Sequence, residues 1–249
     1  MVPRPVTPDE DAALIPQFYA GRSVFVTGAT GFMGKVLIER LLWTCPDIGR
    51  MYLLMREKRD VPVEKRLAQL KGSQVFDVIR AHCPQQLDKL YAVPGDTMKP
   101  QLGIQNLHLQ MLQEVSIVFH SAATLKFDEA LDVAMEQNVL SVTRLMEICD
   151  ELPHMQALIH VSTAYSNAEL SVVSERVYTP PASVRDAIAV AKTVPKEVYI
   201  APKPNTYTFT KALAENAVLE HMTRTYPVAI FRPSIAPMFL HLFRYFFNL

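Results

Sequence analysis

The sequence predicts an α/β fold, a Rossmann-like doubly wound parallel sheet of six or seven strands with helices on both faces. Short apolar runs alternate with segments of helical periodicity along most of the chain, which is typical of βαβ units. The runs are continuously apolar, as expected of strands that are buried on both faces. Three glycines spaced three apart, Gly28, Gly31 and Gly34, follow the first apolar run, and a helical segment begins among them.

The predicted elements alternate regularly. The strands are expected at Ser23–Thr27, Met51–Leu54, Leu90–Val93, Ile117–His120, Ala157–Ser162 and Val228–Phe231. The helices are expected at Phe32–Trp43, Pro62–His82, Leu107–Glu114, Ala130–Asp150 and Thr208–Thr225. Residues 167–204 are irregular and proline-rich, and we expect this insertion to form part of the substrate side. The predicted divisions are a flexible N-terminal arm (1–14), an NAD(P)-binding domain (15–235) and a divergent apolar tail (236–249).

The composition is that of an ordinary globular protein of 249 residues, with 49% hydrophobic and 20% charged residues. Basic and acidic residues balance at 25 each, so nothing indicates a nucleic-acid partner. Three cysteines without CxxC spacing indicate reduced thiols in an intracellular protein and no metal site. No secretory signal is recognisable, and no apolar run reaches the roughly 20 residues that span a bilayer.

The glycine turn is the predicted phosphate site. Gly28 permits a sharp turn, Gly31 a close approach of the backbone to a pyrophosphate, and Gly34 close packing of helix on strand. The helix N-terminus then directs amide groups and the positive end of its dipole at the phosphates. A βα corner that merely needs glycine is the weaker alternative. The residues assigned to the cofactor here are Thr27, Gly28, Thr30, Gly31, Phe32, Met33 and Gly34.

Later strand ends are expected to complete the nucleotide site. Arg56 is the first polar residue after the second strand, and its guanidinium can bond a 2′-phosphate twice, which favours NADPH/NADP+ over NAD(H). The alternative is that Arg56 is a solvated loop charge and Glu57 bonds the ribose. Asp96, after the third strand, can accept a hydrogen bond from the adenine amino group. Small residues after the fourth strand let the backbone approach the nucleotide, namely Ser121, Ala122 and Ala123.

Tyr207 and Lys211 form the predicted catalytic pair. Their i, i+4 spacing at the start of a helix puts phenol and ammonium on one face. Because a nearby cation favours phenolate, we expect Lys211 to lower the pKa of Tyr207. Tyr199 and Lys203 have the same spacing, but Pro202 breaks a helix between them. An ordinary surface pair is the alternative, and the glycine motif disfavours it.

Three more polar residues are candidates for the same site. Ser162 and Thr163 end the fifth strand, where a hydroxyl can donate a hydrogen bond to a substrate carbonyl. Thr163 is narrowly preferred, although strand alternation does not settle the choice. Asn138, inside the helix after the fourth strand, would hold a water molecule next to Lys211. The alternative for Asn138 is an exposed amide or one bonded to nearby backbone.

These motifs together resemble a known superfamily. Thr27-Gly28-x-x-Gly31-x-x-Gly34, the hydroxyl residues of the fifth strand and Tyr207-x-x-x-Lys211 are similar to the extended short-chain dehydrogenases/reductases. Longer runs resemble the fatty acyl-CoA reductases, particularly those of insects. These runs are Gly31–Leu42, Cys45–Ile48, Val118–Thr124 with Phe127–Glu129, His160–Tyr165 and Phe231–Ile235. The likeness covers about residues 15–235.

The resemblance implies NADPH-dependent reduction of a long-chain fatty acyl-CoA to a fatty alcohol through an aldehyde. Tyr207 would give the proton, and Lys211 would hold the ribose. The resemblance also implies an intracellular protein at the cytosolic face of the peroxisomal or endoplasmic-reticulum membrane, with membrane association in full-length relatives. A soluble form and a dimer are left open. Lys192, Lys196 and Lys203 are either contacts to CoA phosphates or solvated loop lysines.

The chain departs from the family pattern after Ile235. The family continues into more of its substrate-binding region and a further C-terminal domain, which residues 236–249 do not match. We therefore expect a C-terminally truncated chain with the substrate domain largely missing and some apolar surface left without a partner. The alternatives to an active reductase are a catalytically silent NADP(H)-binding isoform, or another extended short-chain reductase or epimerase.

Overall fold

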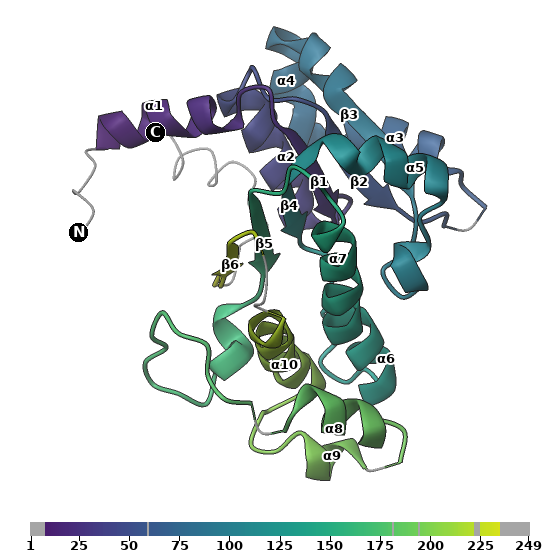
Figure 1. The fold of residues 1–249 in the computed structure, drawn as a ribbon, viewed down its shortest axis with the longest axis vertical. Coiled ribbons are helices and arrows are strands. Elements are labelled where there is room, and N and C mark those ends of the chain that lie inside the picture. Colours follow the sequence, from purple (N-terminus) through teal and green to yellow (C-terminus); the bar gives the residue numbers. More distant parts are fainter. Residues whose placement is uncertain (1–7, 59, 181, 194, 222–224, 235–249) are drawn as a thin grey trace.

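A computed structural model describes residues 8–234, apart from 59, 181, 194 and 222–224. Six parallel strands form one sheet in the order β3-β2-β1-β4-β5-β6, which confirms the predicted doubly wound fold (Figure 1). The strands are β1 (Ser23–Thr27), β2 (Met51–Met55), β3 (Leu90–Pro94), β4 (Val115–His120), β5 (Ala157–Val161) and β6 (Val228–Phe231). Each lies within two residues of its predicted bounds.

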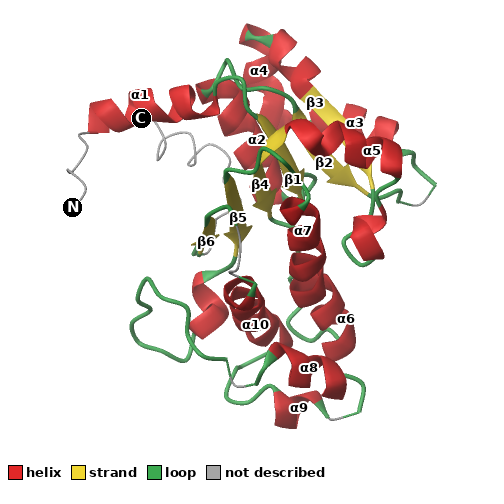
Figure 2. Ribbon diagram, in the orientation of Figure 1, coloured by secondary structure: helices red, strands yellow, loops and turns green. Residues whose placement is uncertain are grey.

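Helices connect and cover these strands (Figure 2). They are α1 (Pro8–Tyr19), α2 (Phe32–Thr44), α3 (Val63–Lys71), α4 (Asp77–His82), α5 (Asn106–Met111), α6 (Leu131–Met135), α7 (Ser141–Asp150), α8 (Val184–Val190), α9 (Lys196–Tyr199) and α10 (Thr206–Glu220). A π-helical turn, Glu136–Leu140, joins α6 to α7, so the predicted helix Ala130–Asp150 is one run with a change of pitch. Among the described residues, no helix has both the length and the apolar character needed to cross a bilayer.

Two segments differ from the predictions. The helix expected over Pro62–His82 is broken, because Gly72 ends α3 and a short 3₁₀ turn precedes α4. Glycine has a low helix propensity, since a helix fixes its flexible backbone. A helix that was not predicted, α1, begins at Pro8 within the arm expected over 1–14, and the flexibility of that arm stays a prediction. The tail predicted at 236–249 lies outside the described residues.

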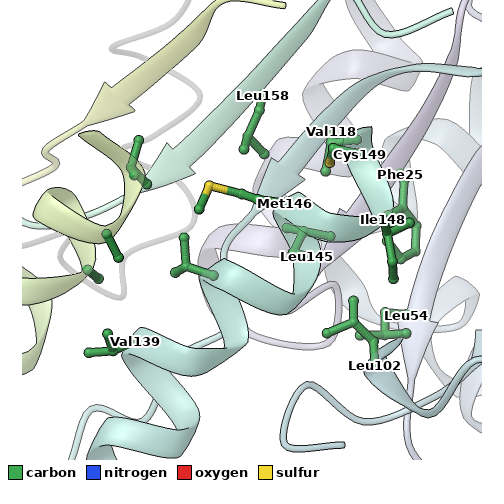
Figure 3. Close-up of a cluster of buried hydrophobic side chains, with 14 of the residues drawn as sticks. Phe25, Leu54, Leu102, Val118, Val139, Leu145, Met146, Ile148, Cys149 and Leu158 are labelled. Carbon is green, nitrogen blue, oxygen red and sulfur yellow. The ribbon is translucent and has the colours of Figure 1, made fainter. Parts of the chain in front are cut away.

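Alternate residues along the strands pack into two separate hydrophobic cores, one on each face of the sheet. Val24 and Val26 of β1 pack with α2, α3 and α4 on one face of the sheet. Phe25, between them, packs with α7 and α10 on the other. Figure 3 shows Leu145 and Met146 of α7 within this second core, among side chains from several strands. All residues of β1, β2 and β4 are buried, which explains why these strands are continuously apolar, whereas Tyr91 of the edge strand β3 is exposed.

The β5–β6 end of the sheet is covered unequally. Val228 and Ile230 pack against the core beneath α10, whereas Ala229 and Phe231 point the other way and are exposed. The side chain of Phe231 is 52% exposed. Two apolar residues of the edge strand β6, Ala229 and Phe231, are thus exposed on this face.

Candidate active site

A cavity of about 630 Å³ opens at the carboxyl ends of the strands, where the strand order reverses between β1 and β4. Doubly wound sheets bind their ligands at this switch point. The structure brings most of the predicted site residues to its lining. These are Gly28, Thr30, Gly31, Phe32, Met33, Gly34, Arg56, Asp96, Ser121, Ala122, Ala123, Ser162, Thr163, Tyr207 and Lys211. Thr27 and Asn138 do not line the cavity.

The glycine turn leaves no room for side chains at two positions. Gly28 has φ +75°, and a Cβ there would lie 2.6 Å from the Ala122 nitrogen. A Cβ on Gly34 would overlap the carbonyl oxygen of Gly28. The end of β1, the start of α2 and the end of β4 are therefore in direct contact through their backbone atoms. Since Gly31 caps α2 without a side chain, the N-terminus of α2 faces the cavity as an anion site.

A basic cluster made of Arg56, Lys58 and Arg66 lies at the end of β2 and lines the cavity. The Arg66 guanidinium donates to the carbonyl oxygen of Arg56 and, at 3.5 Å, to the Thr30 hydroxyl. Burial and the neighbouring Arg56 lower the pKa of Arg66. Within the described residues, no ion pair joins any of the three to an acid. Glu57, the alternative ribose ligand, is not in the lining.

Sequence reasoning missed Arg66 because it comes from α3. Its spacing from Arg56 carries no local signal, and only the fold brings the two guanidinium groups together. Sequence reasoning did name Asp96, which lines the cavity. Its carboxylate accepts a hydrogen bond from the Met98 amide at 3.0 Å.

Thr27 acts on the cavity from beneath, through a chain of buried hydrogen bonds. Its hydroxyl accepts from the Ala122 amide at 3.3 Å and lies 2.8 Å from His120 Nδ1. His120 Nε2 lies 3.3 Å from the Ser141 hydroxyl, which donates to the Gln137 carbonyl oxygen. This network assigns the ring proton to Nε2. Thr27 thus supports the Ala122 wall without lining the cavity itself, and its direct contact with the cofactor stays a prediction.

A second buried histidine, His160, stacks on His120 with ring centroids 5.6 Å apart. Neither ring nitrogen of His160 has a hydrogen-bond partner among the described residues. Burial lowers the pKa of His120 to about 3 and that of His160 well below its ordinary value, with the charge of Lys211 as the next cause. Both rings are therefore neutral. The described part of the chain has no group of three His, Cys, Asp or Glu that could hold a metal.

Lys211 and Tyr207 both line the cavity, but their electrostatics differ from the prediction. The Lys211 ammonium donates to the Val161 carbonyl oxygen at 2.6 Å. Burial lowers the pKa of Lys211 to about 8, against the opposing effect of Glu215. Burial raises the pKa of Tyr207, and its hydrogen bond with Thr163 lowers it. The predicted lowering by Lys211 is wrong, because loss of water around the phenol outweighs every nearby group. The phenol of Tyr207 is therefore neutral at pH 7.

The two hydroxyls that end β5 have different partners. Thr163 is bonded to Tyr207 inside the cavity. The Ser162 hydroxyl donates a hydrogen bond to Glu215 Oε1 at 2.5 Å. Both hydroxyls line the cavity, and the preference for Thr163 over Ser162 as the residue that meets a carbonyl stays a prediction.

Asn138 lies in the π-helical turn and joins two walls of the site. Its Oδ1 accepts from the Thr124 amide at 2.8 Å, and its Nδ2 donates to the Thr124 carbonyl oxygen at 3.3 Å and the Thr210 hydroxyl at 2.9 Å. All three partners belong to the protein, and the water molecule expected next to Lys211 stays a prediction. Asn138 thereby fixes the loop after β4 against α10.

The lysines of the irregular stretch have diverse surroundings. Lys203 is buried and donates to the Ser166 carbonyl oxygen at 2.7 Å and to Glu169 Oε1 at 2.5 Å, so it is not available to CoA phosphates. Lys192 is exposed. The side chain of Lys196 lies outside the described part of the chain.

Comparisons with known proteins find similar sequences over most of the chain. The model of an NAD-binding family described as male sterility protein matches residues 26–238. A putative fatty acyl-CoA reductase of Drosophila melanogaster is 40% identical over 230 residues, and fatty acyl-CoA reductase 1 of Xenopus laevis is 38% identical over 231. Fatty acyl-CoA reductase 2 of Homo sapiens is 37% identical over 229 residues. Each alignment covers 89% of this chain and 44% of the relative, so the chain spans less than half the length of these curated relatives.

Solved structures match the fold. The terminal R domain of the myxalamid PKS-NRPS pathway has a TM-score of 0.61 at 23% identity, over 86% of this chain and 49% of that one. The reductase domain of a non-ribosomal peptide synthetase from Mycobacterium tuberculosis has a TM-score of 0.58 at 25% identity, over 91% and 52%. Yeast methylglyoxal/isovaleraldehyde reductase complexed with NADPH has a TM-score of 0.58 at 17% identity, over 85% and 57%. The Rossmann-like architecture is therefore shared with reductase domains.

Proposed function

The chain belongs to the male sterility protein family of NAD(P)-binding domains, and on this premise we propose that it carries the cofactor-binding and catalytic part of a fatty acyl-CoA reductase. Its reaction is the NADPH-dependent reduction of a long-chain acyl-CoA to a fatty alcohol through an aldehyde. One observation carries the proposal: Tyr207, Thr163 and Lys211 converge on the cavity that the glycine turn opens.

The residues of this cavity fit a dinucleotide. Gly28 and Gly34 let β1, α2 and the end of β4 pack closely through their backbones, and Gly31 and the N-terminus of α2 line the cavity where a pyrophosphate would lie. The cofactor, when bound, would supply one hydride in each of two rounds, of which the first releases CoA as its thiol and leaves the aldehyde and the second gives the alcohol. Thr163 orients the substrate carbonyl, and Tyr207 donates a proton to its oxygen as negative charge develops there. Lys211 supplies a positive charge to the same cavity.

An apolar rim supports a long-chain substrate. Leu125 lines the cavity although its side chain is 68% exposed, and Phe127 is 62% exposed. The Phe127 ring lies 5.8 Å from the ring of Tyr207, and the Thr206 amide donates to the Phe127 carbonyl oxygen at 3.2 Å. The loop after β4 thus presents apolar side chains directly beside the proposed proton donor, where an acyl chain would extend from the reacting carbonyl.

The test of the activity uses the purified chain with NADPH and a long-chain acyl-CoA. Tyr207→Phe should reduce alcohol formation by about 10²- to 10⁴-fold and leave the dissociation constant for NADPH unchanged. Tyr91→Phe, on β3 and outside the cavity, is the matched control and should keep full activity. Cofactor binding without aldehyde or alcohol from the unsubstituted chain contradicts the proposal and favours a silent NADP(H)-binding isoform.

The basic cluster supports NADPH as the cofactor. The Arg66 guanidinium is half-buried and has no acidic partner among the described residues. It can therefore donate strong hydrogen bonds to the 2′-phosphate of NADPH, a group that NADH lacks. Arg66→Met should weaken NADPH binding by about 10- to 100-fold and leave NADH binding unchanged. Arg80→Met removes a guanidinium that already pairs with Asp77, so it should change neither. Equal affinity of the unsubstituted chain for the two cofactors, measured by fluorescence titration, contradicts the assignment.

A further inference from the structure

Glu215 lies one helical turn after Lys211 in α10, and both side chains are buried. We propose that Glu215 is a positioning residue that keeps Lys211 charged, and that Arg232 partly cancels this effect from the other side of the carboxylate. The inference deepens the proposed function and rests on it, since Lys211 belongs to that site.

The carboxylate of Glu215 joins three elements. It accepts from the Ser162 hydroxyl at the end of β5 and from Arg232, just beyond β6, in two bonds. Arg232 Nε lies 2.8 Å from Oε1, and Nη2 lies 2.6 Å from Oε2. The same guanidinium donates to the carbonyl oxygens of Ser174 and Arg176 in the irregular stretch. The pair therefore holds α10 against the sheet and the insertion.

The charges around Lys211 are few. His120 on β4 and His160 on β5 are neutral, because burial lowers the pKa of each. Tyr207, on α10 itself, is protonated, since burial raises its pKa. Among the described groups that act on Lys211, the acid that opposes the cost of burial is Glu215. Removing its charge would take this anion away from Lys211 and leave the Arg232 cation, which is bonded to the same carboxylate, without its partner.

A purely structural role of the Glu215–Arg232 ion pair predicts a different effect on the titration of Lys211. If the Glu215–Arg232 pair only holds α10 in place, losing either partner loosens the same contact, and both losses change Lys211 in the same direction. If charge matters, the two losses act oppositely. Without the carboxylate the ammonium is harder to charge, whereas without Arg232 the carboxylate acts on Lys211 undiminished.

The experiment compares Glu215→Gln with Arg232→Gln. The midpoint of Lys211 titration is followed by NMR of ¹³C-labelled lysine side chains, with the signal assigned by its loss in Lys211→Met. Glu215→Gln should lower the midpoint by about one pH unit, and Arg232→Gln should raise it. Glu39→Gln is the matched control, because Glu39 is buried and bonded twice by Arg40 but lies on α2. It should leave the midpoint unchanged.

Two results overturn the proposal: shifts of the same sign in the two variants, or no shift in Glu215→Gln. If circular dichroism shows that Glu215→Gln does not fold, Arg232→Gln alone decides, because a midpoint that falls or stays contradicts the proposal. Neither cofactor nor acyl-CoA enters the measurement. Opposite shifts in a chain that lacks reductase activity would therefore overturn the proposed function and leave the role of Glu215 standing.

Discussion

The wall of the cavity formed by β1 and α2 is made of backbone, whereas the wall formed by β5 and α10 is made of buried polar side chains. At Gly28 and Gly34 the fold leaves no space for a Cβ atom. In α10, all residues from Thr206 to Val218 are buried, and Lys211 and Glu215 are among them. The backbone wall is sensitive to any added atom and indifferent to pH. The side-chain wall tolerates changes of shape better, but it depends on protonation.

The largest effect is expected at the backbone wall. Gly28→Ala should destabilise the chain by about 4 kcal/mol, because the new Cβ suffers both the positive φ and overlap with the backbone of Ser121 and Ala122. NADPH binding should be lost, and the effect should be the same at pH 6 and pH 9. Gly21→Ala has a similar φ of +70° but open space around it, so it should cost about 1 kcal/mol. Equal costs in urea unfolding would remove the steric argument.

The second-largest effect is expected at Asn138, which joins the loop after β4 to α10. Asn138→Ala should cost about 3 kcal/mol, because it leaves the buried amide and carbonyl of Thr124 and the Thr210 hydroxyl without this partner. Asn106→Ala, on the exposed start of α5, should change stability little. Urea unfolding measures both. A cost for Asn138→Ala no greater than that for Asn106→Ala would show that the walls are not joined here.

The side-chain wall should respond to alkali. Lys211 has a pKa of about 8 in the fold against 10.5 in the unfolded chain, so the unfolded chain binds more protons between these values. Stability should therefore rise with pH across this window. Lys211→Met should raise stability by about 2 kcal/mol at pH 7, with the gain shrinking toward pH 10.5. Urea unfolding at both pH values measures this, and Lys65→Met, on the exposed side of α3, should show no such trend. A pH-independent gain would contradict the prediction.

The smallest effect is expected from His160. Its pKa lies well below 6.5 in the fold, so the folded chain binds fewer protons than the unfolded chain as the pH falls below 6.5, and stability declines there. His160→Leu removes that decline and two ring nitrogens without partners, so stability should rise by about 1 kcal/mol at pH 7 and by more at pH 5. His154→Leu, at an exposed position, is the control. A gain that is smaller at pH 5 than at pH 7 would refute the assignment.

The same contrast explains what the sequence could predict. The backbone wall depends on local spacing, so Gly28, Gly31 and Gly34 and the strand ends were identified with nearly correct bounds. The family resemblance drawn from these motifs is confirmed by the match over residues 26–238. Tyr207 and Lys211 were found by their i, i+4 spacing.

The side-chain wall was only partly predictable, because its partners are distant in sequence. Glu215 meets Arg232 across 17 residues, and Arg66 reaches Thr30 across 36. No periodicity marks such pairs. The pKa of Tyr207 was predicted in the wrong direction, since spacing reports a neighbouring charge but not the loss of water around the phenol.

The π-helical turn at Glu136–Leu140 also sets the phase between two helices. It holds one residue more than an α-helical turn, so α6 and α7 are rotated relative to each other by about 100° compared with an unbroken α-helix. That rotation lets Asn138 face α10 while Leu145 and Met146 still face the sheet. Deleting a single residue here would turn one helix away from its neighbours, whereas the same deletion in the exposed loop 170–176 would not change the phase of any helix. Alignments of related chains should therefore show insertions and deletions in that loop and a constant length across residues 131–150.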